Sequence, residues 1–346
     1  MPLRIGILGL AHGHVGTYCT RWCERDDVQV VAACDRDPKR GEKLRREQGV
    51  RWVDDAADLC RRGDVDAVVI GSETAFHAEH VELAAAAGKV IVLQKPMALT
   101  MAEADRIVAA VERSGVPFTM AWQMRVDPQN LQMRELVRSG VLGRVFMVRR
   151  RHGLATHTWP DFERSWHADA RLNRGMWADD AAHAIDFLLW AFGPPESVTA
   201  EIATLHNPRV PDDNGVAVFR YADGMIAEVA GSFTCLAGEN TTEVIGERGV
   251  IIQNFGDGPS ANAPRPPGAI GLKWLLAGDQ SWRISEHESP ANHGDRIAAL
   301  ADPLADFMAG RRPPLATAHE GRIALAMTLA CYESAEAGRR VTFPSR

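Results

Sequence analysis

The first third of the chain alternates between short apolar runs and longer stretches with a helical pattern. The apolar runs lie at 3–9, 28–35, 65–70, 89–94 and 116–120. Stretches typical of helices separate them, most clearly at 75–87 and 100–114. Runs this short and this apolar suit strands buried on both faces, and their alternation with helices predicts a parallel, doubly wound sheet.

The second half of the chain has a different pattern. Strand-like runs lie at 145–151, 198–205, 215–221, 225–233, 241–245 and 249–253. The turns at 221–224 and 246–249 have the chemistry of hairpins, which predicts antiparallel pairing. A wide open sheet needs a cover for one face, so we expect a homodimer or homotetramer. Residues 292–337 should supply closing helices, with a break at 311–314.

The turn after the first apolar run partly matches a phosphate-binding loop. Dinucleotide-binding turns read Gly-x-Gly-x-x-Gly, and here Gly9 keeps the first position, while Ala11 and His14 take the second and third. The first N–H groups of the helix that follows would hold a pyrophosphate. We therefore expect Gly9, Ala11, His12, Gly13 and His14 to bind the cofactor, although the two histidines could instead reach the substrate or only pack.

An acidic residue ends the second apolar run. Asp35 follows Gly13 by about 20 residues, the distance expected of the residue that binds the adenosine ribose. A carboxylate there repels a 2′-phosphate and favours NAD, whereas Arg36 could stack on adenine or accept that phosphate and so favour NADP. A third reading makes Asp35 an ordinary strand-end or capping residue, because Asp37-Pro38 begins a helix.

Further polar residues follow the later strands of the same half. They are the segments 71–74 (Gly-Ser-Glu-Thr) and 94–96 (Gln-Lys-Pro). Ligands bind at the carboxyl ends of parallel strands, so both segments are candidates for a site. Lys95 precedes a stiffening proline, and its ammonium could bind a hydroxyl or carry its proton, or be an ordinary surface lysine.

The strongest candidate for acid–base chemistry lies at 175–186. Asp179, His183 and Asp186 are spaced i, i+4 and i+7, so a helix would carry all three on one face. A histidine oriented by carboxylates suits proton transfer in alcohol or carbonyl chemistry, although a solvated polar stripe gives the same spacing. The preceding loop, 152–177, is rich in Trp, His and Arg, which suits recognition of a polyol.

These motifs, in this order, resemble those of the family of glucose–fructose oxidoreductase, inositol dehydrogenase and the rhizopine-catabolism oxidoreductases. The family's Glu-Lys-Pro signature appears as Gln94-Lys95-Pro96, and its Asp-x-Gly-x-His signature as the run from Asp179 to His183. The run at 138–143 resembles the segment that enters the second domain. The likeness extends from Ile5 to about Phe343.

The resemblance implies a Rossmann domain at 1–122 and, at 123–346, an α/β domain on a large open, mostly antiparallel sheet, whose C-terminal helices could pack back on the first domain. It implies hydride transfer between a nicotinamide and a carbon of a sugar, sugar derivative or cyclitol. Lys95 and His183 would handle the hydroxyl proton, and Asp179 would bind substrate or orient the site. The remaining residues that the resemblance implies near cofactor or substrate are Ser72, Thr74, His77, Gln94, Pro96 and Arg125. The composition of the loop at 152–177 adds His152 and Trp166 as substrate residues.

Two departures from the family pattern bear on this site. Gln94 replaces a carboxylate, so Lys95 lacks a charged neighbour there. Ala181 replaces a glycine, and its methyl group would hinder a close approach of that turn to the cofactor. Two other functions use the same residues: a lyase or glycoside-cleaving enzyme that oxidises its substrate transiently, and a cofactor-binding regulator without catalysis.

Composition narrows the possible partners, the location and the metal content of the protein. With 346 residues, a net charge of −6 and no long basic run, the chain does not suit nucleic acid as a partner. No apolar run reaches the roughly 20 residues of a membrane span, and a strand begins the chain in place of a signal peptide, so we expect a cytoplasmic protein. Cys19 and Cys23 fit packing better than zinc, and we expect no metal site. The Pro/Gly-rich loop at 256–271 should be mobile.

Overall fold

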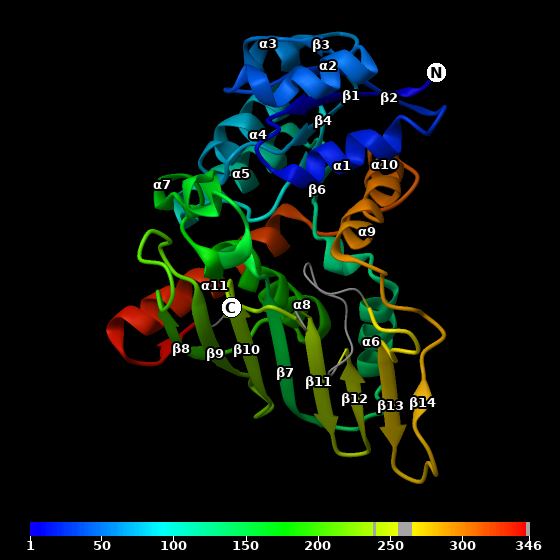
Figure 1. Ribbon diagram of the computed structural model, residues 1–346, viewed down its shortest axis with the longest axis vertical. Helices are drawn as coiled ribbons and strands as arrows, with labels where there is room; N and C mark the ends of the chain where they lie inside the picture. The colour runs from blue at the N-terminus through cyan, green and yellow to red at the C-terminus, as the bar shows by residue number, and fades with distance from the viewer. Residues whose placement is uncertain (238–239, 255–264, 344–346) are drawn as a thin grey trace. The chain divides into compact units, whose positions relative to one another are not determined.

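The computed structural model describes residues 1–237, 240–254 and 265–343 (Figure 1). The chain forms two compact units. The first contains residues 1–126, 171–173 and 296–325, and the second contains 127–170, 174–295 and 326–346. The boundary divides three helices, α7 (Ala170–Asn173), α9 (His293–Ala298) and α11 (Ala318–Ala337).

A six-stranded parallel sheet forms the centre of the first unit, in the order β3-β2-β1-β4-β5-β6. Its strands are β1 (Leu3–Leu8), β2 (Val28–Cys34), β3 (Arg51–Trp52), β4 (Ala67–Ile70), β5 (Val90–Leu93) and β6 (Phe118–Met120). The strand order reverses between β1 and β4, as in Rossmann folds. The predicted doubly wound sheet is confirmed; the sequence analysis missed β3, whose two residues form no apolar run.

The helices of this unit begin and end at recognisable signals. They are α1 (Gly13–Trp22), α2 (Glu42–Gln48), α3 (Ala56–Arg61), α4 (His77–Ala86), α5 (Met101–Ser114) and α10 (Ala301–Met308). α5 shows the signals clearly: Thr100 and Glu103 form a capping box at its start, and Gly115 ends it with a φ of 67°. The predicted helix at 100–114 therefore matches to within a residue.

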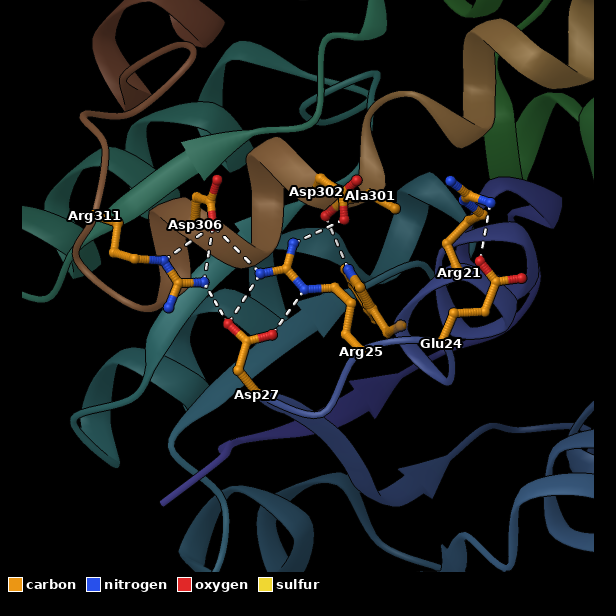
Figure 2. A network of polar contacts seen from close by, with 9 residues as sticks. Arg21, Glu24, Arg25, Asp27, Ala301, Asp302, Asp306 and Arg311 are labelled. Atoms are coloured by element: carbon orange, nitrogen blue, oxygen red, sulfur yellow. Dashed lines mark hydrogen bonds and ion pairs between the residues drawn. The ribbon is translucent and has the colours of Figure 1, made fainter.

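Helix α10 packs against α1, although almost the whole chain separates them in sequence. The indole of Trp22 donates a hydrogen bond to the carbonyl of Ala301 at 2.8 Å, and Leu304 joins the buried cluster beside it. Around this contact, Arg25 pairs with Asp27 and Asp302, and the rest of the network is completed by Asp306 and Arg311 (Figure 2). Because these ion pairs are largely exposed, the burial of Trp22 contributes most of the stabilisation.

The second unit is built on a nine-stranded sheet with the order β14-β13-β12-β11-β7-β10-β9-β8-β15. The strands are β7 (Val145–Gly153), β8 (Ser197–Ala203), β9 (Asn214–Arg220), β10 (Ile226–Ser232), β11 (Thr241–Gly246), β12 (Gly249–Gln253), β13 (Leu272–Leu276), β14 (Arg283–Ile284) and β15 (Val341–Thr342). In the described part of this sheet, all neighbours pair antiparallel except β7 and β10, which are parallel. The expected large, mostly antiparallel sheet is confirmed.

The two faces of this sheet differ. On β7, Val148 and Arg150 are buried on the side where α8 (Ala182–Phe192) packs, with α6 (Pro128–Arg138) beside it. The alternate residue Met147 is exposed, as are Val216 and Val218 of β9. One face thus carries helices and the other presents apolar side chains.

Most of the loop at 256–271, which was expected to be mobile, lies outside the described residues. Within the described ranges, no helix has the length and apolar character to span a membrane, and no cluster of His, Cys, Asp or Glu is arranged to hold a metal ion.

Candidate active site

The loop after β1 is fixed against the loop after β4. The N–H of His12 donates to the carbonyl of Gly71 at 2.9 Å, and the N–H of Gly71 donates to that of Leu8 at the same distance. Gly9 has a φ of +88°, and a Cβ there would come closer than 3.0 Å to the backbone nitrogen and Cα of Ser72. Only glycine fits this position, as the Rossmann motif requires for its tight turn.

The first turn of α1 is suited to an anion. No side chain caps the helix at His12, and no acidic residue lies in the first turn. A Cβ added to Gly13 would meet nothing within 4 Å, so the space before these N–H groups is open on the protein side. His12 is buried and its ring contacts that of His14 edge-on at 4.3 Å. The loop therefore fits the pyrophosphate of a dinucleotide.

Asp35 ends β2 beside this loop, as predicted, but its side chain is only 1% exposed. One carboxylate oxygen accepts the N–H of Leu10 at 2.5 Å, and the other accepts that of Asp37 at 2.7 Å and faces Arg40 at 3.2 Å. Asp35 thus holds the turn in place. Arg36 is exposed and its guanidinium lies 4.0 Å above the ring of Phe76.

The segment after β4 is held by histidines of α4. The two ring nitrogens of His77 lie 3.2 Å from the carbonyl oxygen of Ser72 and 2.9 Å from that of Pro96. Burial lowers the pKa of His77 to about 4, so the ring is neutral at physiological pH. His80 Nδ1 lies 3.0 Å from the hydroxyl of Ser72, and the hydroxyl of Thr74 donates to Asn173 at 3.1 Å. His77 therefore joins two of the predicted cofactor segments, a positioning role.

Gln94, Lys95 and Pro96 follow β5 and are all buried. The amide of Gln94 donates to the hydroxyl of Tyr18 on α1 at 3.0 Å, which gives the unusual glutamine a structural partner. Lys95 is 5% exposed and the peptide bond that joins it to Pro96 is cis. The predicted lysine is therefore enclosed at the carboxyl edge of the sheet, unlike an ordinary surface lysine.

Arg125, which the resemblance places near the substrate, is buried and has a partly exposed ionic partner. Its guanidinium donates to the carbonyl of Leu315 at 2.9 Å and pairs with Glu320 at 2.7 Å. Burial alone would raise the pKa of Glu320, but Arg125 and the hydrogen bonds from Thr317 together hold that pKa below its usual value. This contact fixes the C-terminal segment to the end of the parallel sheet.

In the second unit, the predicted helix at 175–186 begins with a π-helical turn at Trp177–Ala181 and continues as α8. The expected α-helical spacing of Asp179, His183 and Asp186 is therefore altered, because the wider turn rotates Asp179 relative to the others. All three side chains are buried, which excludes the alternative of a solvated polar stripe. Turns of this kind recur at functional sites.

Two glycines on neighbouring strands make room for this turn. Gly215 of β9 and Gly231 of β10 are paired across the sheet. A Cβ at Gly231 would lie 2.8 Å from the Cβ of Ala181, and one at Gly215 would lie 2.9 Å from the ring of Trp177. The alanine that departs from the family signature is thus accommodated by a missing side chain on the facing strand.

His183 lies against a second histidine. His152, the penultimate residue of β7, is buried, and its ring centroid is 4.8 Å from that of His183. Its Nδ1 lies 3.2 Å from a carboxylate oxygen of Asp180. The expected substrate residue His152 therefore contacts His183 and a carboxylate that the sequence analysis did not select.

Asp179 has a partner that was not predicted either. Its carboxylate oxygen lies 2.6 Å from Nδ1 of His167, and the ring of His167 contacts that of Trp166 at 3.9 Å between centroids.

Asp212 was also missed by the sequence analysis. Its carboxylate accepts the N–H of Trp177 at 2.7 Å and the hydroxyl of Tyr332 at 2.9 Å. Burial raises the pKa of Asp212 to about 6. No local pattern links these residues, because they come from separate loops.

The comparisons with known proteins agree with this geometry. Residues 3–122 match the model of the oxidoreductase family with an NAD-binding Rossmann fold, and residues 130–252 match the GFO/IDH/MocA C-terminal domain. The chain belongs to this family. It is therefore an oxidoreductase with an NAD-binding domain, and the expected cofactor class is confirmed.

Several relatives have curated names. The chain is 31% identical over 262 residues to the myo-inositol dehydrogenase Hyg17 of Streptomyces leeuwenhoekii, covering 73% of this chain and 76% of that one. It is 29% identical over 250 residues to the 1-carboxy-3-chloro-3,4-dihydroxycyclo hexa-1,5-diene dehydrogenase of Comamonas testosteroni, covering 70% of this chain and 61% of that enzyme. Levoglucosan dehydrogenase in complex with NADH has the same fold, with a TM-score of 0.83 at 20% identity over 100% of both chains.

Proposed function

We propose that this protein is an NAD-dependent dehydrogenase or reductase that acts on a CH–OH carbon of a sugar, a sugar derivative or a cyclitol. The observation that carries the proposal is the buried histidine pair of the second unit, His183 with His152, beside the carboxylates of Asp179 and Asp180. Buried, oriented imidazoles of this kind suit transfer of a hydroxyl proton. The names of the relatives support a polyol as substrate.

The cofactor site of the first unit would bind two parts of NAD, the pyrophosphate and the adenosine ribose. The first turn of α1 and Gly13 would receive the pyrophosphate, and Asp35 or Arg36 would face the adenosine ribose. NAD, when bound, supplies the hydride acceptor of the reaction. The exposed Arg36 keeps NADP as an alternative, which the assay below compares directly.

The proton would be handled by this chain's own side chains. We assign His183 and Lys95 to the hydroxyl of the substrate, with Asp179 as a substrate ligand oriented by His167. His152 is assigned to position His183, because it lies between that ring and Asp180. Trp166 would support His167 from the side. Arg125 is assigned a structural role through Glu320.

The assembly and location are part of the same proposal. Residues 1–122 would bind the cofactor, and 123–346 would bind substrate and form the interface of a homodimer or homotetramer. Val216 and Val218 on the open face of the sheet support that interface, because exposed apolar side chains on a sheet favour a covering partner. Free buried thiols such as Cys19 and Cys331 suit the reducing cytoplasm.

The test is the nicotinamide absorbance band, followed with purified protein, NAD or NADP and a panel of sugars, cyclitols and sugar acids. We expect turnover with one class of polyol and a preference for NAD. A product formed without net NADH would instead favour transient oxidation by a lyase. NAD binding without any turnover, unchanged in Lys95→Ala, would favour a regulator.

A further inference from the structure

The second unit contains a cavity of about 170 Å³ that the proposed reaction does not use. It lies among the loop at 156–163, the loop at 206–213 and the end of β10. We name it the aromatic cavity, defined by His157, Trp159, Phe162, His206, Asp213 and Phe233. All of its lining residues belong to the second unit.

The walls of the aromatic cavity are rings held at right angles to one another. Phe162 meets Phe233 edge-to-face at 5.3 Å and Trp159 at 6.0 Å. His157 meets His206 in the same way at 5.2 Å. The lining thus combines the apolar rings of Phe162 and Phe233 with the ring nitrogens of His157, Trp159 and His206. This mixture suits a ligand with apolar C–H faces and hydroxyl groups, as in a sugar ring.

The charge of the aromatic cavity restricts the ligand further. Among the described residues that line it, three are carboxylates, Asp161, Glu163 and Asp213, and none is Lys or Arg. Burial opposes the charge on Asp213, but backbone N–H groups at 205–207 donate to it and hold its pKa below the usual value. Asp161 pairs with Arg164 and Glu163 pairs with Arg209, so Asp213 is the lining carboxylate that would repel a carboxylate or phosphate on the ligand. A neutral ring is therefore favoured beside Asp213.

The size of the cavity and its position indicate how such a ring would be used. Its volume is below the roughly 300–1,000 Å³ of pockets that hold drug-sized ligands, so it admits about one ring. Phe162 forms its wall and also stacks on His167, with centroids 6.1 Å apart and planes at 18°. His167 in turn lies 2.6 Å from Asp179. The aromatic cavity therefore shares a wall with the group that would hold the substrate.

We propose that the aromatic cavity is a subsite for a second sugar ring, so that the substrate class is a neutral glycoside rather than a free monosaccharide or an acidic sugar. The ring to be oxidised would lie at Asp179 and His183, and the second ring would lie beyond Phe162. The substrate class rests on the proposed function, but the existence of the subsite does not, since binding requires no turnover.

The first experiment measures binding to the protein saturated with NAD, by titration calorimetry and saturation-transfer NMR. The probes are cellobiose, maltose, phenyl β-D-glucoside, D-glucose, myo-inositol and D-glucuronate. We expect at least one two-ring probe to bind at least about ten-fold more tightly than D-glucose, a difference of about 1.4 kcal/mol. If no two-ring probe binds more tightly than D-glucose, or if D-glucuronate binds best, the subsite is refuted.

Variants then locate the binding. Val210 lines the aromatic cavity and is buried, so Val210→Trp should fill it, while Trp159→Ala removes a wall that is 39% exposed. The control is Trp282→Ala, a tryptophan with a similar exposure of 38% in the segment between β13 and β14. We expect both cavity variants to lose at least about ten-fold in affinity for the two-ring probe, with unchanged affinity for D-glucose and NAD, and the control to lose nothing.

The outcomes separate the two proposals. Undiminished two-ring binding in Trp159→Ala refutes the subsite even if Val210→Trp fails to fold. An equal loss for D-glucose and the two-ring probe would also refute it, because the cavity would then act on the first ring. Failure of the proposed function shows instead as absent NADH formation, with the calorimetric binding intact.

Discussion

Replacement of Gly9 by alanine tests the described geometry of the nucleotide loop. The left-handed φ of +88° costs a residue with a Cβ about 1–2 kcal/mol. The new Cβ would also overlap backbone atoms of Ser72, which cannot move aside as a flexible side chain can, and overpacking of this kind costs about 1–3 kcal/mol. We therefore expect Gly9→Ala to lower the free energy of unfolding by about 2–5 kcal/mol and to weaken NAD binding.

Gly13→Ala is the matched control, because a Cβ there meets nothing within 4 Å of the protein. Its stability should stay within about 0.5 kcal/mol of wild type, since alanine is tolerated in the first turn of a helix. If the pyrophosphate lies before α1, this Cβ enters the ligand's space and lowers NAD affinity at least about ten-fold.

Urea unfolding followed by tryptophan fluorescence measures the stability, and calorimetry measures NAD affinity. A Gly9→Ala protein that unfolds within about 1 kcal/mol of wild type would refute the close contact with Ser72. Wild-type NAD affinity in Gly13→Ala would refute the placement of the pyrophosphate at the start of α1.

Three further predictions follow from individual contacts. Lys95→Met should abolish turnover and leave the calorimetric affinity for NAD near wild type; surviving turnover would contradict the role of Lys95. Burial lowers the pKa of His77 from 6.5 to about 4. The contribution of His77 to the free energy of unfolding is therefore fully present above pH 6.5 and falls by about 3 kcal/mol as the pH drops to 4. His77→Gln should therefore flatten the fall in unfolding free energy between these pH values, and an unchanged slope would exclude His77 as its cause. Trp22→Phe removes the bond to Ala301 and should lower the free energy of unfolding in urea by about 1–2 kcal/mol. Arg311→Ala, whose ion pairs are exposed, should lower it by less than Trp22→Phe does, and the reverse order would contradict the weight given to Trp22.

Local sequence determined the elements whose signals are short-range. All parallel strands of the first unit except β3 are continuous apolar runs, and α5 lies between a capping box and a glycine in the left-handed conformation, so pattern alone predicts these elements. The phosphate loop and His183 were found in the same way, because each belongs to a motif within a few residues. The role of Lys95 came from the family resemblance, which added further residues near the cofactor but no geometry.

Tertiary structure decided which groups meet. His167 with Asp179 and His152 with His183 join segments from different elements. The parallel pairing of β7 with β10 and the packing of α10 on α1 join positions even farther apart in sequence. Such contacts depend on how apolar faces are buried together, and no local pattern encodes them.

The π-helical turn shows which features the local sequence determined and which the tertiary structure determined. The sequence placed Asp179 and His183 one turn apart and identified Ala181 as a departure from the family signature. It did not show that Gly231, fifty positions later, leaves the space that Ala181 occupies, or that Asp212 would accept the N–H of Trp177. Sequence thus determined which residues carry the chemistry, whereas packing between distant strands and loops decided their partners, because close approach depends on side chains that the local pattern does not contain.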